Sequence, residues 1–159
     1  MEGVDRARDR VQERLDRLTE GDRSPTVNQE TVVANSEQYR RAIERSLDGV
    51  FRVRVAVTDG TGDVLATTGE DEPALPCGRT EPNESLGTAA RRIVREQAGL
   101  DCVPREVVEA TISGVRNSDE PTAQAVYRLS IVYVAELADP TSEPDHGRWK
   151  PAHTVDAPL

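Results

Sequence analysis

A polar loop that turns directly into a charged helix, residues 78–100, constrains the fold of this chain more than any other stretch. Glu84 or Ser85 can cap the first turn of that helix through a side-chain oxygen. Gly99 can end the helix in the left-handed conformation, which glycine adopts without steric cost. We therefore expect a helix over about 85–98, with one hydrophobic face and charged residues at fixed spacings on the remainder.

The sequence on both sides of this stretch alternates between hydrophobic and polar residues, which is typical of strands with one buried face. Asp59 and Gly60 form a turn signal between two such segments, so the first pair is expected to be a hairpin. The tail from residue 139 contains several prolines and is expected to be mostly irregular. The predicted strands cover residues 51–57, 64–67, 107–113 and 125–137.

The first 49 residues have a helical character of their own. Residues 2–19 predict a helix with a narrow hydrophobic seam, which can dock on the domain or on a second copy of the chain. A linker over 20–26 and a short strand over 29–34 follow. Asn35, with Gln38 three residues later, then forms a capping pair for a second amphipathic helix that ends near residue 49.

The charge of the chain is strongly acidic and excludes some classes of partner. Asp and Glu number 29 against 20 Lys and Arg, for a formal net charge of -9. Such a surface repels nucleic acid and anionic membranes, and aromatics at 3% offer few platforms for stacking bases. Only one basic residue, Lys150, is a lysine. Acidity without lysine indicates a halophile with a salt-rich cytoplasm, and a genome biased toward arginine codons is the alternative.

Cysteine content and hydrophobic patterning favour a cytoplasmic protein. Cys77 and Cys102 are too few for a disulfide framework, and their hydrophobic neighbours suit buried free thiols. No stretch has the length and hydrophobicity of a membrane-spanning helix, and no hydrophobic leader follows a basic segment at the N-terminus. We expect a cytoplasmic protein without nucleic-acid or membrane partners.

Seven positions in the central stretch carry fixed residue types at fixed spacings: Gly78, Glu84, Arg92, Val94, Glu96, Gly99 and Leu100. Their arrangement resembles the signature of the Nudix (MutT-like) hydrolase family, G-x5-E-x7-R-E-U-x-E-E-x-G-U, in which U is an aliphatic residue. The resemblance implies an α+β fold, an α/β/α sandwich of helices around a mixed β-sheet, for residues 50–159. Residues 1–49 form a helical N-terminal extension outside it.

The resemblance also implies a reaction. Members of the family hydrolyse a nucleoside diphosphate linked to another moiety, by attack of water on phosphorus with the help of Mg²⁺ or Mn²⁺. Glu84 and Glu96 are the implied metal ligands, and Glu96 and Arg92 the implied catalytic residues. Arg116 and Arg128 lie on or near strands beside the expected site, where a guanidinium group can bind phosphate. They are the predicted substrate-binding residues.

The sequence departs from the family signature at two glutamate positions, which carry Ile93 and Gln97. On a helical wheel these two residues share an arc with Leu86 and Ala90, which is the hydrophobic side of the helix. We therefore expect an attenuated Nudix pyrophosphohydrolase. The alternative is a catalytically silent Nudix-fold module that binds a nucleotide or a protein. A third use is structural, with the helix over 2–19 joining two copies in a homodimer.

Overall fold

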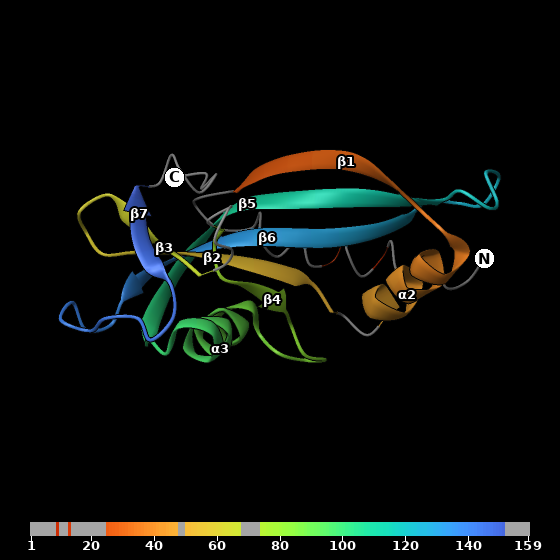
Figure 1. The fold of residues 1–159 in the computed structure, drawn as a ribbon. Coiled ribbons are helices and arrows are strands. Elements are labelled where there is room, and N and C mark those ends of the chain that lie inside the picture. The colour runs from red at the N-terminus through yellow and green to blue at the C-terminus, as the bar shows by residue number, and fades with distance from the viewer. Residues whose placement is uncertain (1–8, 10–12, 14–24, 48–49, 68–73, 152–159) are drawn as a thin grey trace.

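The structure is a computed structural model that describes residues 25–47, 50–67 and 74–151, together with residues 9 and 13. The expected helix over 2–19 therefore falls almost entirely outside the described residues. The described helices are α2 (Ser36–Leu47) and α3 (Leu86–Ala98), shown in Figure 1. The described strands are β1 (Thr26–Ala34), β2 (Arg52–Thr58), β3 (Asp63–Ala66), β4 (Cys77–Arg79), β5 (Cys102–Asn117), β6 (Val126–Leu137) and β7 (Arg148–Pro151).

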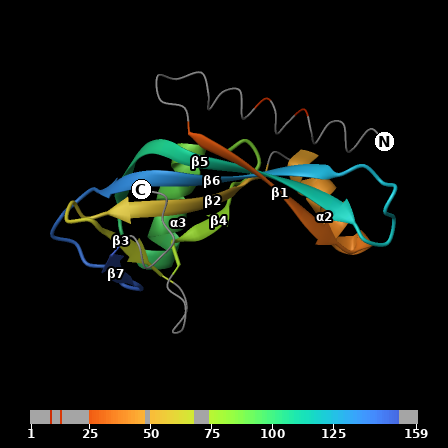
Figure 2. The same cartoon turned by 90° about the horizontal axis from the view of Figure 1, so that it is seen from above.

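All seven described strands join one mixed sheet, in the order β1-β5-β6-β2-β3-β7 (Figure 2). The short strand β4 pairs with the first half of β2, beside β3 on the same edge. The β1–β5 and β2–β6 pairs are parallel, and the other pairs are antiparallel. Since β1 pairs with β5 along its whole length, residues 26–34 belong to the same sheet as the rest of the domain.

The main core lies between α3 and one face of the sheet. The alternating pattern of β2 places Val53, Val55 and Val57 on this face, where each is fully buried. The neighbouring strand β6 contributes Leu129 and Ile131 to the same cluster, as its odd-numbered positions predict. The hairpin and the long strand expected from hydrophobic alternation are thereby confirmed.

Helix α3 begins and ends at the residues that the sequence indicates. The Ser85 side chain, rather than Glu84, forms the N-cap and accepts a hydrogen bond of 3.2 Å from the Thr88 backbone N–H. At the other end Gly99 has φ +71° and donates its N–H to the carbonyl of Arg95 at 3.0 Å. The predicted helix over 85–98 is confirmed.

Helix α2 covers the opposite face of the sheet, near its far end. Asn35 and Gln38 exchange backbone-to-side-chain hydrogen bonds of 2.9 and 3.1 Å, which is the expected capping pair. Tyr39 and Ala42 pack against Val126 of β6. The odd-numbered residues of β6 belong to the main core beside α3, so Val126 and α2 lie on the other face of the sheet. Helices on both faces of a mixed sheet make the expected α/β/α sandwich, and the predicted fold class is confirmed.

The described part of the tail is mostly irregular, as expected, but the segment expected as a loop before α3 is partly strand. The tail contains strand β7, in which Trp149 lies opposite Leu65 of β3 and packs against the main core. The loop before α3 contains strand β4, which pairs with β2. Both strands are three or four residues long and are stabilised by partners distant in the sequence, so local patterning does not reveal them.

Both cysteines are free thiols, as expected. Cys102 is buried, and this burial raises the pKa of its thiol to about 11, whereas Cys77 is only partly buried. Among the described residues, neither helix has the length and hydrophobicity needed to cross a bilayer.

Candidate functional site

Arg92 on α3 organises the predicted catalytic residues. Its guanidinium group donates from Nε to Glu84 Oε2 at 3.0 Å and from Nη2 to Glu84 Oε1 at 2.9 Å, which is a bidentate pair. Nη2 also donates to the backbone carbonyl of Arg79 at 2.7 Å, and Nη1 lies 3.4 Å from Glu96 Oε2. The structure therefore brings Glu84, Arg92 and Glu96 together, as the sequence predicts.

The two glutamates differ in exposure and in electrostatics. The Glu84 side chain is 10% exposed, and its hydrogen bonds from Arg92 lower the pKa of the carboxyl group below its ordinary value. The same hydrogen bonds raise the pKa of Arg92. The Glu96 side chain is 63% exposed and meets Arg92 at the solvent boundary. Both oxygens of Glu84 are thus engaged by the protein, while Glu96 remains accessible.

Ile93 is a core residue. It is 1% exposed within the cluster that joins α3 to the sheet. A Cβ atom added to Gly78 would lie 2.9 Å from Ile93 Cγ1, so helix and strand approach each other closely at this point. The side chain at this position of the family signature therefore packs against the backbone of β4 and does not reach solvent.

Gln97 is bound to the backbone of β4. Its Nε2 donates to the carbonyl of Cys77 at 2.5 Å, and its Oε1 accepts from the Cys77 N–H at 3.2 Å. The side-chain amide of Gln97 thereby pairs with both the N–H and the carbonyl of Cys77, in the way that the backbone of a neighbouring strand would. A carboxylate cannot donate the first of these bonds, so glutamine is the side chain that suits this position.

The described residues do not fit a site built to hold a divalent metal ion. Mg²⁺ takes oxygen ligands in nearly octahedral geometry and usually binds one or two carboxylates. No group of three or more His, Cys, Asp or Glu side chains suited to a metal ion occurs in the part of the chain that the structure describes. Of the two predicted ligands, Glu84 is held by Arg92 and only Glu96 is largely exposed.

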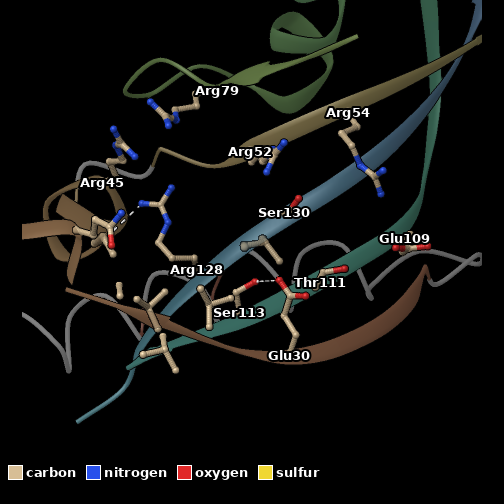
Figure 3. A pocket seen from close by; sticks show the side chains of 17 residues that line it. Glu30, Arg45, Arg52, Arg54, Arg79, Glu109, Thr111, Ser113, Arg128 and Ser130 are labelled. Carbon is tan, nitrogen blue, oxygen red and sulfur yellow. Dashed lines mark hydrogen bonds between the residues drawn. The ribbon is translucent and has the colours of Figure 1, made fainter. Parts of the chain in front are cut away.

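A pocket on the sheet face opposite α3 gathers five arginines from four elements (Figure 3). We call it the arginine pocket; its volume is about 680 Å³. Its arginines are Arg45 of α2, Arg52 and Arg54 of β2, Arg79 of β4 and Arg128 of β6. On the side of β1 and β5 the polar lining residues are acidic or hydroxylated, namely Glu30, Glu109, Thr111 and Ser113, and the remaining ones are hydrophobic.

Strand geometry explains why these arginines converge. Arg52 and Arg54 alternate with the buried valines of β2, so they project from the opposite face. Arg79 lies directly opposite Arg52 in the β2–β4 pair, and Ser130, two residues from Arg128, lies opposite Arg52 in the β2–β6 pair. Like charges directly opposite each other destabilise a sheet. The arrangement costs stability that the fold must recover elsewhere.

The arginines of the pocket lie close enough together to perturb one another electrostatically. Burial, followed by repulsion from Arg45 and Arg79, lowers the pKa of Arg128 to about 10. The pKa of Arg45 is also lowered, by burial first and then by Arg79 and Arg41. Among the described residues, no carboxylate forms an ion pair with any of the five arginines. The chain as a whole has a net charge of -9, so this local excess of positive charge would attract anionic ligands to the arginine pocket rather than to the rest of the surface.

The two predicted phosphate-binding arginines lie in different places. Arg128 lines the arginine pocket and donates to the carbonyl of Ala42 at 3.4 Å. Arg116 is exposed and lines a separate pocket of about 340 Å³ with residues that include Ile112 and Tyr127. The structure therefore brings Arg128, but not Arg116, together with the other pocket arginines.

Sequence reasoning missed four of the five pocket arginines: Arg45, Arg52, Arg54 and Arg79. A signal was available for Arg52 and Arg54, since two arginines at alternate positions of a strand share one face. The pocket is also linked to the predicted catalytic residues through Arg79. Its side chain lines the pocket and its carbonyl accepts from Arg92, so one residue joins both groups.

Comparison with known proteins gives a family match. A family model described as the NUDIX domain matches residues 50–158, which is more than half of the chain. No curated protein matches the chain.

Several solved structures are similar in fold at low identity. A NUDIX hydrolase from Nitrosomonas europaea has 19% identity and a TM-score of 0.47, over 67% of this chain and 59% of its own. An ADP-ribose pyrophosphatase from Streptococcus suis has 18% identity and a TM-score of 0.43, over 63% and 72%. A UDP-X diphosphatase has 15% identity and a TM-score of 0.47, over 93% and 61%. This chain spans only 36% of a longer protein from Sinorhizobium meliloti, at 18% identity and a TM-score of 0.46.

Proposed function

This chain belongs to the Nudix family, and we propose that it is an attenuated hydrolase of a nucleoside diphosphate linked to another moiety, which it binds in the arginine pocket. The family match supports the expected enzyme class, a Nudix pyrophosphohydrolase. The single observation that carries the substrate proposal is the convergence of five arginines without ion-pair partners among the described residues.

The chemistry of the pocket suits a diphosphate joined to a group rich in hydroxyls. Guanidinium groups bind phosphate oxygens through two parallel hydrogen bonds, and a diphosphate offers oxygens to several of them at once. At the other end of the pocket, Glu109 and the hydroxyls of Thr111 and Ser113 can exchange hydrogen bonds with sugar hydroxyls. A nucleoside diphosphate derivative has both kinds of group.

The catalytic roles rest on the residues around Arg92. Glu96 is the exposed carboxylate beside the loop that carries Arg79, and it is our candidate to accept a proton from the attacking water. Arg92 holds Glu96 from one side and fixes the loop through the Arg79 carbonyl. Glu84 positions Arg92. The pocket arginines neutralise and orient the phosphates.

Attenuation follows from Ile93 and Gln97. In the resemblance to the family, these positions carry glutamates, and Mg²⁺ or Mn²⁺ supplies charge neutralisation when bound. Here one side chain is buried, the other is bound to Cys77, and Glu84 is held by Arg92, so Glu96 is the one predicted ligand that is largely exposed. Loss of a general base alone typically costs about 10² to 10⁴ in rate.

The same observation favours a second candidate function. A helix whose two altered positions serve packing and backbone hydrogen bonding is consistent with a catalytically silent module that binds a nucleotide. In that case the arginine pocket keeps its role and turnover is absent.

We further propose a halophilic, cytoplasmic protein that needs neither nucleic acid nor membrane, from its net charge of -9.

The experiment is an activity assay of the full chain on a panel of nucleoside diphosphate derivatives, with Mg²⁺ or Mn²⁺ in high salt. The hydrolase predicts slow turnover that is lost in Glu96→Gln and in Arg54→Ala. Arg105→Ala is the matched control, since Arg105 lies on the surface in an ion pair with Glu136 and should keep full activity. Absence of turnover on every compound, with a rise in melting temperature on adding nucleotide, would favour the silent module.

A further inference from the structure

We propose that this domain binds the diphosphate group of its ligand without a divalent cation, and that Mg²⁺ weakens the binding. The inference rests on the proposed function, in that it assumes the arginine pocket to be the ligand site. It goes beyond that function by assigning to the five arginines the charge neutralisation that the family resemblance assigns to a metal ion. Three observations carry it.

The first observation is the poverty of metal ligands. Arg92 occupies both oxygens of Glu84 in a bidentate pair. The Gln97 amide donates a hydrogen bond to the carbonyl oxygen of Cys77, a hard oxygen of the kind that Mg²⁺ binds. Ile93 fills the space between α3 and Gly78 with hydrocarbon. Among the residues at and around the signature positions of α3, the contacts are thus made by arginine, amide and alkyl groups, and only Glu96 offers a largely exposed carboxylate.

The second observation is the sign of the local charge. Cross-strand pairing puts Arg79 opposite Arg52, and Arg79 also contributes to the lowered pKa of Arg45 and Arg128. The guanidinium groups of these arginines repel a divalent cation near the arginine pocket and attract a diphosphate. The bridging diphosphate of a diester carries two negative charges, and the pocket lining holds five arginines against two carboxylates, Glu30 and Glu109. No metal is needed to balance the ligand.

The third observation concerns geometry. The arginines come from four elements, α2, β2, β4 and β6, which form the side of the pocket away from β1 and β5 (Figure 3). Guanidinium groups from several elements can contact both phosphates at once. In solution Mg²⁺ binds the same phosphate oxygens. It therefore competes with the arginines for the ligand and lowers the concentration of the free anion.

The test is titration calorimetry of the full chain with inorganic pyrophosphate, in EDTA and then at increasing Mg²⁺. We expect binding in EDTA, and a Kd that rises as Mg²⁺ is added. Arg54→Ala and Arg128→Ala should each weaken binding in EDTA by about tenfold, the loss expected for one charge-assisted hydrogen bond. Arg105→Ala, at an exposed ion pair, is the control and should bind as the wild type does. Melting curves establish that each variant is folded.

The outcomes separate the inference from the proposed function. Binding that requires Mg²⁺, or that tightens when Mg²⁺ is added, overturns the inference and leaves the arginine pocket as the ligand site. Binding in EDTA that neither arginine variant weakens also overturns it, because the anion then sits elsewhere. Absence of binding in both conditions by folded protein removes the arginine pocket as a phosphate site, and with it both proposals.

Discussion

Among single residues, the pair of Glu84 and Arg92 sets the conformation of the loop before α3. Glu84→Gln keeps the shape of the side chain but removes its charge and one acceptor. We expect the free energy of unfolding to fall by about 2 kcal/mol at neutral pH, which is typical of a hydrogen bond to a charged group. Urea denaturation measures this. Asp101→Asn is the control, because the exposed Arg95–Asp101 pair should contribute little.

The same pair predicts a dependence on pH. Arg92 lowers the pKa of Glu84 in the folded state, so its stabilisation is complete above the ordinary value of 4.5 and is lost as pH falls through the folded value. The difference in stability between wild type and Glu84→Gln should therefore shrink in acid below pH 4.5. A difference that stays constant down to the acid transition would contradict the assignment.

Restoring the family's glutamates tests the roles of Ile93 and Gln97. Because Ile93 is buried, Ile93→Glu should cost several kcal/mol of stability, or unfold the domain, through burial of an unpaired carboxylate. Gln97→Glu replaces a donor that faces the Cys77 carbonyl with an acceptor. Calorimetry with and without Mg²⁺ measures both changes. A double variant that Mg²⁺ stabilises would show that these positions reach a metal site; Ile93→Val, expected to cost about 1 kcal/mol, is the packing control.

Some residues of the site could be predicted from the sequence and others could not, because only residues close together along the chain leave a local pattern. Arg92 and Glu96 are four positions apart on α3, and this spacing predicts their proximity. Glu84 precedes the helix, and its position in the family signature is what identifies it. The partner of Gln97 is the backbone of Cys77, which no side-chain pattern identifies. Arg45 and Arg128 meet only because the sheet places α2 beside β6.

Among the elements, α3 depends on its glycine stop. In the described structure both Gly99 and Gly62 have positive φ, +71° and +99°, so alanine is strained at either position. A Cβ atom at Gly62 would meet nothing within 4 Å, whereas at Gly99 it would overlap the Asp145 carboxylate. We expect Gly62→Ala to cost about 1 kcal/mol and Gly99→Ala to cost more, as measured by thermal unfolding. Equal losses would mean that Asp145 moves away freely.

Elements with strong local signals were predictable, and short elements were not. Hydrophobic alternation and caps located β2, β6, α2 and α3 within a few residues. Strands β4 and β7 contain few alternating positions and exist because β2 and β3 offer them unpaired edges. The extra length of β5 likewise follows from pairing with β1 and β6 on its two sides.

The whole molecule has a negative net charge, whereas the lining of the arginine pocket is rich in positive charge. Salt screens both. We expect KCl, raised from low to molar concentration, to increase the melting temperature by reducing self-repulsion among the carboxylates. The same salt should weaken the binding of pyrophosphate. A melting temperature that falls with KCl would contradict the first expectation, and affinity insensitive to KCl the second.

Assembly is a separate question for the whole molecule. The predicted helix over 2–19 lies almost entirely outside the described residues, and its seam has two alternative docking partners. If it joins two copies, deletion of residues 1–25 should halve the mass measured by light scattering. An unchanged mass would remove the homodimer.

The contacts of Ile93 and Gln97 with β4 limit single substitutions toward the glutamates of the family signature. One reversion places a carboxylate in the core, and the other sets a carboxylate against the Cys77 carbonyl. Each lowers stability when made alone, and a natural domain has only about 5–15 kcal/mol to lose. Neither single step creates a metal site that would compensate. Substitution toward the family signature at these two positions is therefore expected to lower stability at each single step, without a compensating metal site.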